Sequence, residues 1–279
     1  MARFWSEQCP AGTLEKGRTP LLWAAEGGYD GIVKLLLETG RVDADSKNQF
    51  SRTALSLASE MGHVPVVNRL LKTSVVDPDS NASGAYDAGR TPLSYASGKG
   101  HEEVVRRLLG TGKVDPDARA RGAFWPGRTP LSFAVGHGHT AVAELLLRTG
   151  KVDVNSISIG RYVRFCAPLL WFGTSRSAFS ELEFTEEIVR GRTPLWWAVE
   201  TRADISVIRL VLENGADVEA RPEDGRTALS IAAEDGEAAT MELLLAYGAN
   251  SEAMDKSGKK PLDYARERDN EAVIRLLER

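Results

Sequence analysis

The four histidines of the chain are the first residues to test for metal binding or acid–base catalysis. His63, His101 and His139 each follow a glycine and lie 38 residues apart. Such regular spacing indicates a structural role, in which each imidazole bonds to local backbone. His137 lies two residues before His139, but neither a cysteine nor a third ligand is near this pair, whereas a zinc site needs three or four ligands. The histidines therefore predict no metal site.

Paired carboxylates are the second candidates, because two acids close together can perform general acid–base catalysis. The pairs recur at equivalent places, which favours turn side chains that bond to the backbone; they are Asp43/Asp45, Asp77/Asp79 and Asp115/Asp117. Cys166 has no histidine at a fixed spacing and is interpreted as a buried apolar residue rather than a nucleophile. The sequence contains no P-loop, Gly-x-Ser-x-Gly or Cys-x-x-Cys motif. We therefore predict a protein that is not an enzyme and that has no cofactor.

Composition and charge narrow the class of protein further. The 279 residues include 35 lysines and arginines against 39 aspartates and glutamates, a net charge of −4. A globally basic nucleic-acid binder is therefore not expected. No apolar run approaches the roughly 20 residues of a membrane span, and the N-terminal MARFWSEQCP lacks the apolar core of a secretory signal. Two cysteines 157 residues apart indicate a reducing compartment, so we predict a cytoplasmic protein, with the nucleus as an alternative, and no membrane association.

A repeated phrase indicates which elements must position these residues. Gly-Arg-Thr-Pro-Leu occurs at 17–21, 89–93, 127–131 and 191–195, with variants at 51–55, 225–229 and 258–262. The anchor position, a threonine in six copies and Lys260 in the last, recurs every 33 to 38 residues, except for a gap of 64 after Thr129. Within this gap, Ala167-Pro168-Leu169-Leu170-Trp171 echoes Thr19-Pro20-Leu21-Leu22-Trp23. We interpret the gap as one further copy that is degenerate and shortened.

Each unit carries the signals of two short helices. Thr19 is a typical N-cap, and Pro20 follows at the first helical position, where its missing N–H costs nothing. Gly27-Gly28 ends this first helix. A second helix follows with apolar residues at the spacing of one buried face, namely Ile32, Val33, Leu35, Leu36 and Leu37. One such unit cannot bury its own apolar face, so stacking against neighbours must stabilise it.

This pattern resembles the ankyrin repeat, in which helix–turn–helix units open with Thr-Pro-Leu and are joined by projecting finger loops. The resemblance implies an all-α solenoid over residues 17–279, preceded by an N-terminal segment or cap at 1–16. The seven clear units, first to seventh, cover about 17–50, 51–88, 89–126, 127–164, 191–224, 225–257 and 258–279, and the degenerate unit covers 165–190. The family's usual histidine three residues after the threonine is absent, and in four units a serine replaces it: Ser56, Ser94, Ser132 and Ser230.

A basic residue precedes the anchor position in all seven clear units, and a glutamate follows that position by seven residues in five of them. The basic residues are Arg18, Arg52, Arg90, Arg128, Arg192, Arg226 and Lys259, and the glutamates are Glu26, Glu60, Glu200, Glu234 and Glu267. This pairing favours an arginine–glutamate ladder over a phosphate-binding stripe, with surface pairs worth about 0–1 kcal/mol each. Charge is also uneven, because residues 89–166 carry a net +6 and residues 180–252 a net −10. Such asymmetry orients partners, unless it reflects neutral drift of a solvated surface.

We predict a non-enzymatic scaffold that binds a protein partner with the concave face and finger loops of the solenoid. Aromatic and arginine side chains, which are enriched at binding hot spots, concentrate in two fingers: Arg119, Arg121, Phe124 and Trp125 in the third, and Arg161, Tyr162, Arg164 and Phe165 in the fourth. Lys99 and His137, at the ends of two first helices, are expected on the same concavity. We expect an acidic, partly apolar protein segment as partner, no nucleic acid, and a monomeric chain. The alternative for Phe124 and Trp125 is that they fold back on the neighbouring finger.

Two further expectations concern the degenerate unit and the origin of the chain. The degenerate unit keeps an apolar first helix but lacks the apolar second one, so we expect an imperfect stacking interface and unfolding of the array as two blocks. The phrases Leu-Leu-Glu-Thr-Gly-Arg-Val-Asp and Gly-Arg-Thr-Pro-Leu look like the long ankyrin arrays of filamentous fungi, which often follow a nucleotide-binding signalling domain. The alternative function is therefore a sensor or assembly-regulating tail derived from a larger fungal signalling protein of that kind.

Overall fold

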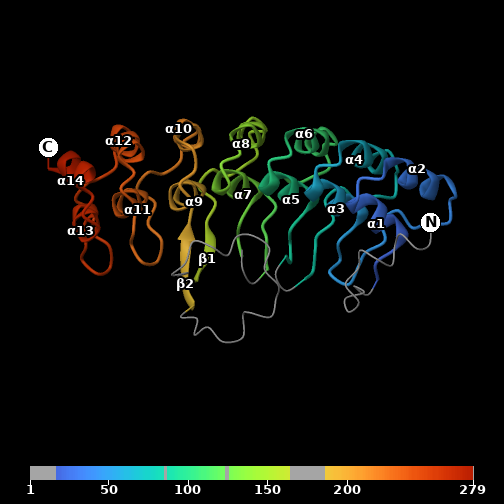
Figure 1. Cartoon of the computed structure of the whole chain (residues 1–279), viewed down its shortest axis with the longest axis horizontal. Coiled ribbons are helices and arrows are strands. Elements are labelled where there is room, and N and C mark those ends of the chain that lie inside the picture. The colour runs from blue at the N-terminus through green and yellow to red at the C-terminus, as the bar shows by residue number, and fades with distance from the viewer. Residues whose placement is uncertain (1–16, 85–86, 123–125, 164–185, 279) are drawn as a thin grey trace.

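The computed structural model describes residues 17–84, 87–122, 126–163 and 186–278. These residues form fourteen helices and one two-stranded ribbon, arranged as seven helix pairs in a row (Figure 1). The first helices of the pairs are α1 (Pro20–Glu26), α3 (Ala54–Met61), α5 (Pro92–Lys99), α7 (Pro130–Gly136), α9 (Pro194–Glu200), α11 (Ala228–Asp235) and α13 (Pro261–Glu267). The second helices are α2 (Asp30–Glu38), α4 (Val64–Leu71), α6 (Glu102–Gly110), α8 (Thr140–Leu147), α10 (Ile205–Glu213), α12 (Ala238–Ala246) and α14 (Glu271–Leu277). The predicted helical solenoid is confirmed.

The anchor threonine caps six of the seven first helices as predicted, and Lys260 holds this position in the seventh. Thr19 caps α1 by accepting the N–H of Leu22, and Pro20 occupies the first helical position. In the second, third and fourth units the serine that replaces the family's histidine completes a reciprocal cap. In the second unit, for example, Thr53 Oγ1 accepts the Ser56 N–H at 3.2 Å, and Ser56 Oγ accepts the Thr53 N–H at 3.1 Å. Both otherwise unpaired donors at the start of the helix are thereby satisfied.

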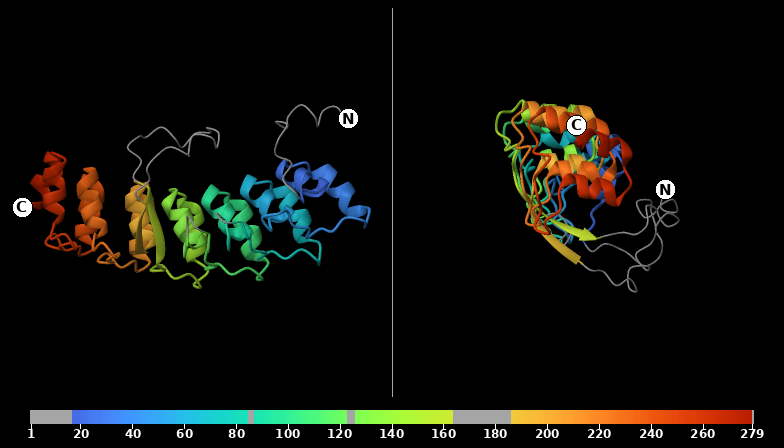
Figure 2. Two further views of the ribbon diagram at one scale, coloured as in Figure 1. Left: turned by 90° about the horizontal axis from the view of Figure 1, so that it is seen from below. Right: turned by 90° about the vertical axis from the view of Figure 1, so that its left-hand side faces the viewer.

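The core is a continuous layer between the two rows of helices. Each first helix packs against the next first helix along the array, and each second helix against the next second helix. The leucine two residues after the anchor threonine is fully or almost fully buried in six units; these are Leu21, Leu55, Leu93, Leu131, Leu195 and Leu229. Finger loops project from one edge of this helical array (Figure 2). The apolar area is therefore buried between units, which is the stabilising arrangement of a solenoid.

The fourth finger continues into an antiparallel ribbon of β1 (Ser158–Val163) and β2 (Glu186–Arg192). Val163 pairs with Glu186 at the far end of the ribbon, and Ser158 pairs with Arg192 beside the helices. The chain therefore leaves the array and returns to it at adjacent points, with residues 164–185 between them.

The fourth and fifth units stack directly on each other, with α7 against α9 and α8 against α10. Trp197 on α9 donates its Nε1–H to Ser158 Oγ at 2.7 Å, and the Asp217 N–H bonds to Asn155 Oδ1 at 2.8 Å. The fourth and fifth units therefore contact each other directly, and residues 164–185, which make up most of the predicted degenerate unit 165–190, lie outside the described residues. Its echo of Thr-Pro-Leu-Leu-Trp lies outside the described residues.

Candidate interaction surface

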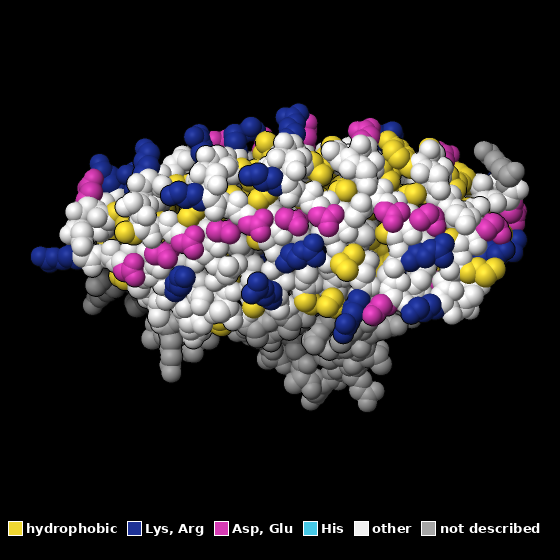
Figure 3. All heavy atoms as spheres, turned by 180° about the vertical axis from the view of Figure 1, so that it is seen from behind, with side chains coloured by type: hydrophobic (Ala, Val, Ile, Leu, Met, Phe, Trp, Pro, Cys, Tyr) yellow, Lys and Arg dark blue, Asp and Glu magenta, His cyan; other side chains and the backbone are white. Residues whose placement is uncertain are grey.

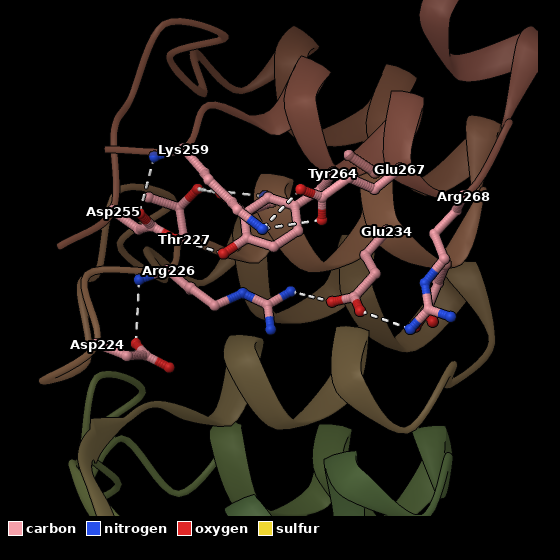
Figure 4. Close-up of polar contacts among 12 residues, drawn as sticks. Asp224, Arg226, Thr227, Glu234, Asp255, Lys259, Tyr264, Glu267 and Arg268 are labelled. Atoms are coloured by element: carbon pink, nitrogen blue, oxygen red, sulfur yellow. Dashed lines mark hydrogen bonds and ion pairs between the residues drawn. The ribbon is translucent and has the colours of Figure 1, made fainter. Parts of the chain in front are cut away.

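The predicted arginine–glutamate ladder is present in four units. Arg18 pairs with Glu26, Arg52 with Glu60, Arg226 with Glu234, and Lys259 with Glu267, in each case linking the residue before the anchor position to the end of the first helix. Figure 4 shows the last two of these pairs, where Glu234 also bonds to Arg268 of the following unit at 2.9 Å. The side chains of Arg52 and Glu60 are only 15% and 17% exposed. This pair is therefore better shielded from water than an ordinary surface pair, whereas Lys259 and Glu267 are 40% and 53% exposed.

Aromatic rings alternate with the ladder cations, a feature that the sequence reading missed. The Arg90 guanidinium lies 4.1 Å from the centre of the Tyr95 ring and 4.4 Å from that of Phe133. Arg128 lies between Phe133 and Trp197 in the same way, at 4.5 and 4.4 Å. Each ring thus contacts the cation of its own unit and that of the unit before. The signal in the sequence is an aromatic residue four positions after the anchor residue, which recurs in five units.

Two neighbouring units depart from the ladder. Gly98 and Gly136 stand where the third and fourth units would have the ladder glutamate. Arg90 donates to the Ser94 carbonyl at 3.1 Å and lies 3.8 Å from the Asp87 carboxylate, and Arg128 donates to the Ser132 carbonyl at 2.5 Å. Burial, together with the nearby charges of Arg90 and Arg192, lowers the pKa of Arg128 to about 9. These two units therefore keep the ladder arginine but lack the acidic residue that ends the first helix in the units with a ladder pair.

The structure describes four of the predicted site residues with their side chains. Lys99 ends α5 and is exposed. His137 caps the end of α7, is exposed, and lies with Nδ1 2.7 Å from the Phe133 carbonyl oxygen. In the third finger, exposed Arg119 lies 3.8 Å from Asp153 of the fourth unit, and the N–H of exposed Arg121 bonds to the Ala88 carbonyl at 2.6 Å.

The remaining predicted residues are only partly described. Arg161 and Tyr162 belong to β1, where their backbones pair with Ile188 and Glu187 of β2. The other four, Phe124, Trp125, Arg164 and Phe165, lie outside the described residues. The four described residues belong to the adjacent third and fourth units, and the structure does not test whether one partner contacts all ten.

Three of the four histidines link neighbouring units, in what we term clasps. His63 Nε2 lies 2.8 Å from the Glu26 carbonyl oxygen, and His101 Nε2 lies 2.9 Å from that of Glu60. His139 Nε2 lies 3.2 Å from the carbonyl oxygen of Gly98. In the seventh unit an amide replaces the imidazole and donates to two carbonyls at 3.0 Å. The predicted structural role of these histidines is confirmed, but the backbone that each one contacts belongs to the preceding unit.

The paired acids also act on the backbone, as predicted. Asp43, Asp77 and Asp115 each accept the N–H of the second acid of the pair, at 2.9 to 3.0 Å. Asp45 in turn accepts the N–H of Asp77 in the next unit at 3.4 Å. A row of acidic side chains runs along the molecule on the face seen in Figure 3. Among the described residues, no group of three or more histidine, cysteine or acidic side chains has an arrangement that would hold a metal ion.

Comparison with known proteins agrees with this geometry. A family model described as ankyrin repeats, in three copies, matches residues 3–82, 75–158 and 204–279. The chain belongs to the ankyrin-repeat family. The matches leave out residues 159–203, which contain the ribbon and the inserted segment. Domains of this family are generally scaffolds for protein–protein interaction and are typically not enzymes.

Two solved ankyrin structures resemble the chain over nearly its whole length. The human ASB11 ankyrin repeat domain is 25% identical with a TM-score of 0.71, and the match covers 94% of this chain and 99% of that one. The ankyrin repeat domain of Bcl-3, a member of the IkappaB family, is 28% identical with a TM-score of 0.66, covering 95% and 100%. A sequence search among curated proteins gives no match. Within the described part of the chain, no helix is long and apolar enough to cross a membrane.

Proposed function

We propose that this ankyrin array is a non-enzymatic scaffold that binds an acidic, partly apolar protein segment on the concave face and fingers of its third and fourth units. The observation that supports this location is the replacement of the ladder glutamate by Gly98 and Gly136 in two adjacent units. The arginine of each unit remains, so the first helix of each of these units has at least one acidic residue fewer than the first helices of the four units with a ladder pair. An acidic segment would meet a favourable field at this surface.

The surrounding residues fit the same partner. Lys99, Arg119 and Arg121 are exposed cations of the third unit. Phe124 and Trp125 follow in the same finger and supply the aromatic surface that an apolar segment would contact. Arg161, Tyr162, Arg164 and Phe165 provide the equivalent residue types in the fourth finger. We propose that a monomeric chain acts in this way in the cytoplasm.

Selection from a displayed library of random peptides on the full chain tests the proposal without a known partner. We expect the recovered peptides to be enriched in aspartate and glutamate next to apolar residues, and to bind less tightly as salt concentration rises. Trp125→Ala should weaken such a peptide by about 2 kcal/mol, which is roughly a 30-fold increase in Kd, with the fold intact. A double variant Arg119→Glu with Arg121→Glu should weaken it too.

Arg275→Glu is the matched control, because Arg275 is an exposed arginine of the seventh unit, far along the array from the proposed surface. It should leave peptide binding unchanged. If Trp125→Ala lowers thermal stability while peptide binding stays the same, the tryptophan is structural and the site is wrongly placed. Peptides without acidic enrichment would refute the proposed partner chemistry.

A further inference from the structure

The clasp position is defined by a backbone hydrogen bond as well as by sequence. The residue ten positions after the anchor residue donates its N–H to the carbonyl five positions after it, as His63 does to Ala58 and His139 does to Ala134. In the fifth unit the same bond joins the Ala203 N–H to the Ala198 carbonyl at 2.8 Å. Ala203 therefore occupies the clasp position, and its methyl group stands where the second, third and fourth units have an imidazole.

A pocket lies where that imidazole is missing. It has a volume of about 570 Å³ and is lined by Gly136, His137 and Gly138 of the fourth unit and by residues 201–204 of the fifth. At the three boundaries that have a histidine clasp, the imidazole lies so close over the equivalent glycine that a Cβ atom there would come within 2.6 Å of a ring atom; those glycines are Gly28, Gly62 and Gly100. A Cβ atom on Gly138 would meet nothing within 4 Å.

The pocket keeps the acceptor that a clasp uses. The Gly136 carbonyl is equivalent to those of Glu26, Glu60 and Gly98, each of which contacts a clasp nitrogen. No described residue donates a hydrogen bond to this carbonyl. The carboxylate of Asp204, which accepts the Ser206 N–H at 2.8 Å, adds negative charge to the wall, and its pKa is lowered chiefly by that bond. A planar side chain with an N–H donor therefore matches both the shape and the polarity of the pocket.

The imidazole must come from another molecule. The sequence has four histidines, of which three are clasps at other boundaries, and the fourth, His137, already lines the pocket. Because His137 stacks on His139 with ring centres 6.2 Å apart and near-parallel planes, its ring is held as a wall of the pocket. A second ring entering the pocket would lie over Gly138 with a nitrogen directed at the Gly136 carbonyl.

We propose that this pocket between the fourth and fifth units binds a histidine side chain of a partner protein, which takes the place of the missing clasp. The inference adds a specific contact to the protein-binding function proposed above. It rests on that function only in one respect, namely that the histidine belongs to a protein partner. Binding would join the two units as His63, His101 and His139 join their own neighbours, and would therefore stabilise the boundary at which the inserted ribbon leaves the array.

Imidazole itself is the probe for the test, titrated into the full chain at a pH above its own pKa. We expect saturable shifts of the amide NMR signals of Gly138 and Ala203, with a Kd of about 1 to 100 mM for so small a ligand. Ala203→His should fill the pocket from within, abolish these shifts and raise the thermal midpoint. Ala203→Leu fills the space without a donor and should also abolish them.

His139→Ala is the matched control, because it opens an equivalent vacancy over Gly100. Imidazole should restore part of the thermal stability that the His139→Ala variant loses. The thermal midpoint of this variant should therefore rise with imidazole concentration more than the midpoint of the Ala203→His variant does. Shifts at Gly138 and Ala203 that fail to saturate in the wild type would overturn the proposal, whatever the variants do. Since no partner is used, this failure would leave the peptide selection on the third and fourth fingers unaffected.

Discussion

Residues 164–185 offer a direct test of how the array is held together. The strands on either side pair up to Val163 and Glu186, so the ends of the segment are adjacent. We predict that a turn of about four residues can replace the 22 residues of 164–185 without loss of helical structure. Shortening the loop reduces its closure entropy by (3/2)RT ln(22/4), so the folded array should gain about 1.5 kcal/mol. For a chain of this size, that gain corresponds to a rise of about 3 to 6 °C in the thermal midpoint.

Urea denaturation followed by circular dichroism measures this change, because the signal comes from the helices. A second variant replaces 164–185 with a Gly/Ser segment of the same length, which separates the effect of loop length from that of the side chains; its stability should equal that of the wild type. If both variants lose about 3 kcal/mol or more, residues 164–185 bury apolar surface against the array. That result would refute the reasoning that the fourth and fifth units need only each other.

Three further predictions follow from single residues. Glu60→Gln should lower the free energy of unfolding by about 1–2 kcal/mol in urea denaturation, because it leaves a largely buried arginine without its carboxylate, whereas Glu271→Gln in an exposed pair should cost less than about 0.5 kcal/mol. Burial, with the neighbouring aspartates, raises the pKa of Asp79 from 3.8 to about 6, so its carboxyl favours the folded state at low pH and this contribution is lost as pH rises through about 6. Asp79→Asn, which copies Asn155 of the fourth unit, should therefore be more stable than the wild type by about 1 kcal/mol near pH 7 and equal to it near pH 4 in thermal melts; a constant difference across this range would contradict the assignment. In hydrogen exchange, the Ala203 amide should exchange faster than the equivalent amides of the three clasp histidines, and equal rates would show that the clasps do not protect their boundaries.

The sequence was most informative where one residue controls one local hydrogen bond. Thr19 and Pro20 predicted the start of a helix, and the structure confirms the cap. The spacing between Arg52 and Glu60 predicted an ion pair for the same reason, because both residues belong to one unit and recur with it. Contacts within one unit are predicted reliably because the same residues recur in several units, and because the bonded groups lie close together in the sequence.

Contacts between units were harder to predict. The missing clasp at Ala203 is readable from the sequence only by counting ten residues from Thr193, and the pocket it leaves depends on the glycines of the preceding unit. The alternation of cations and rings, such as Arg90 between Tyr95 and Phe133, likewise joins residues from two units. The direct contact between the fourth and fifth units was also not readable, because sequence similarity does not show whether a segment such as 165–190 lies within the array or outside it.

The clasps also determine where the array is stiff and where it is compliant. The three boundaries between the first and fourth units each carry an imidazole bonded to the backbone of the preceding unit. These four units should therefore resist bending together. At the next boundary the clasp is absent and a pocket takes its place. Glu237 takes the clasp position at the boundary after that one, so neither boundary of the fifth unit carries an imidazole. Bending of the array should therefore change the angles at these two boundaries before the angles at the clasped ones. A ligand bound in this pocket would stiffen the boundary between the fourth and fifth units. The curvature of the solenoid would then depend on whether the pocket is occupied.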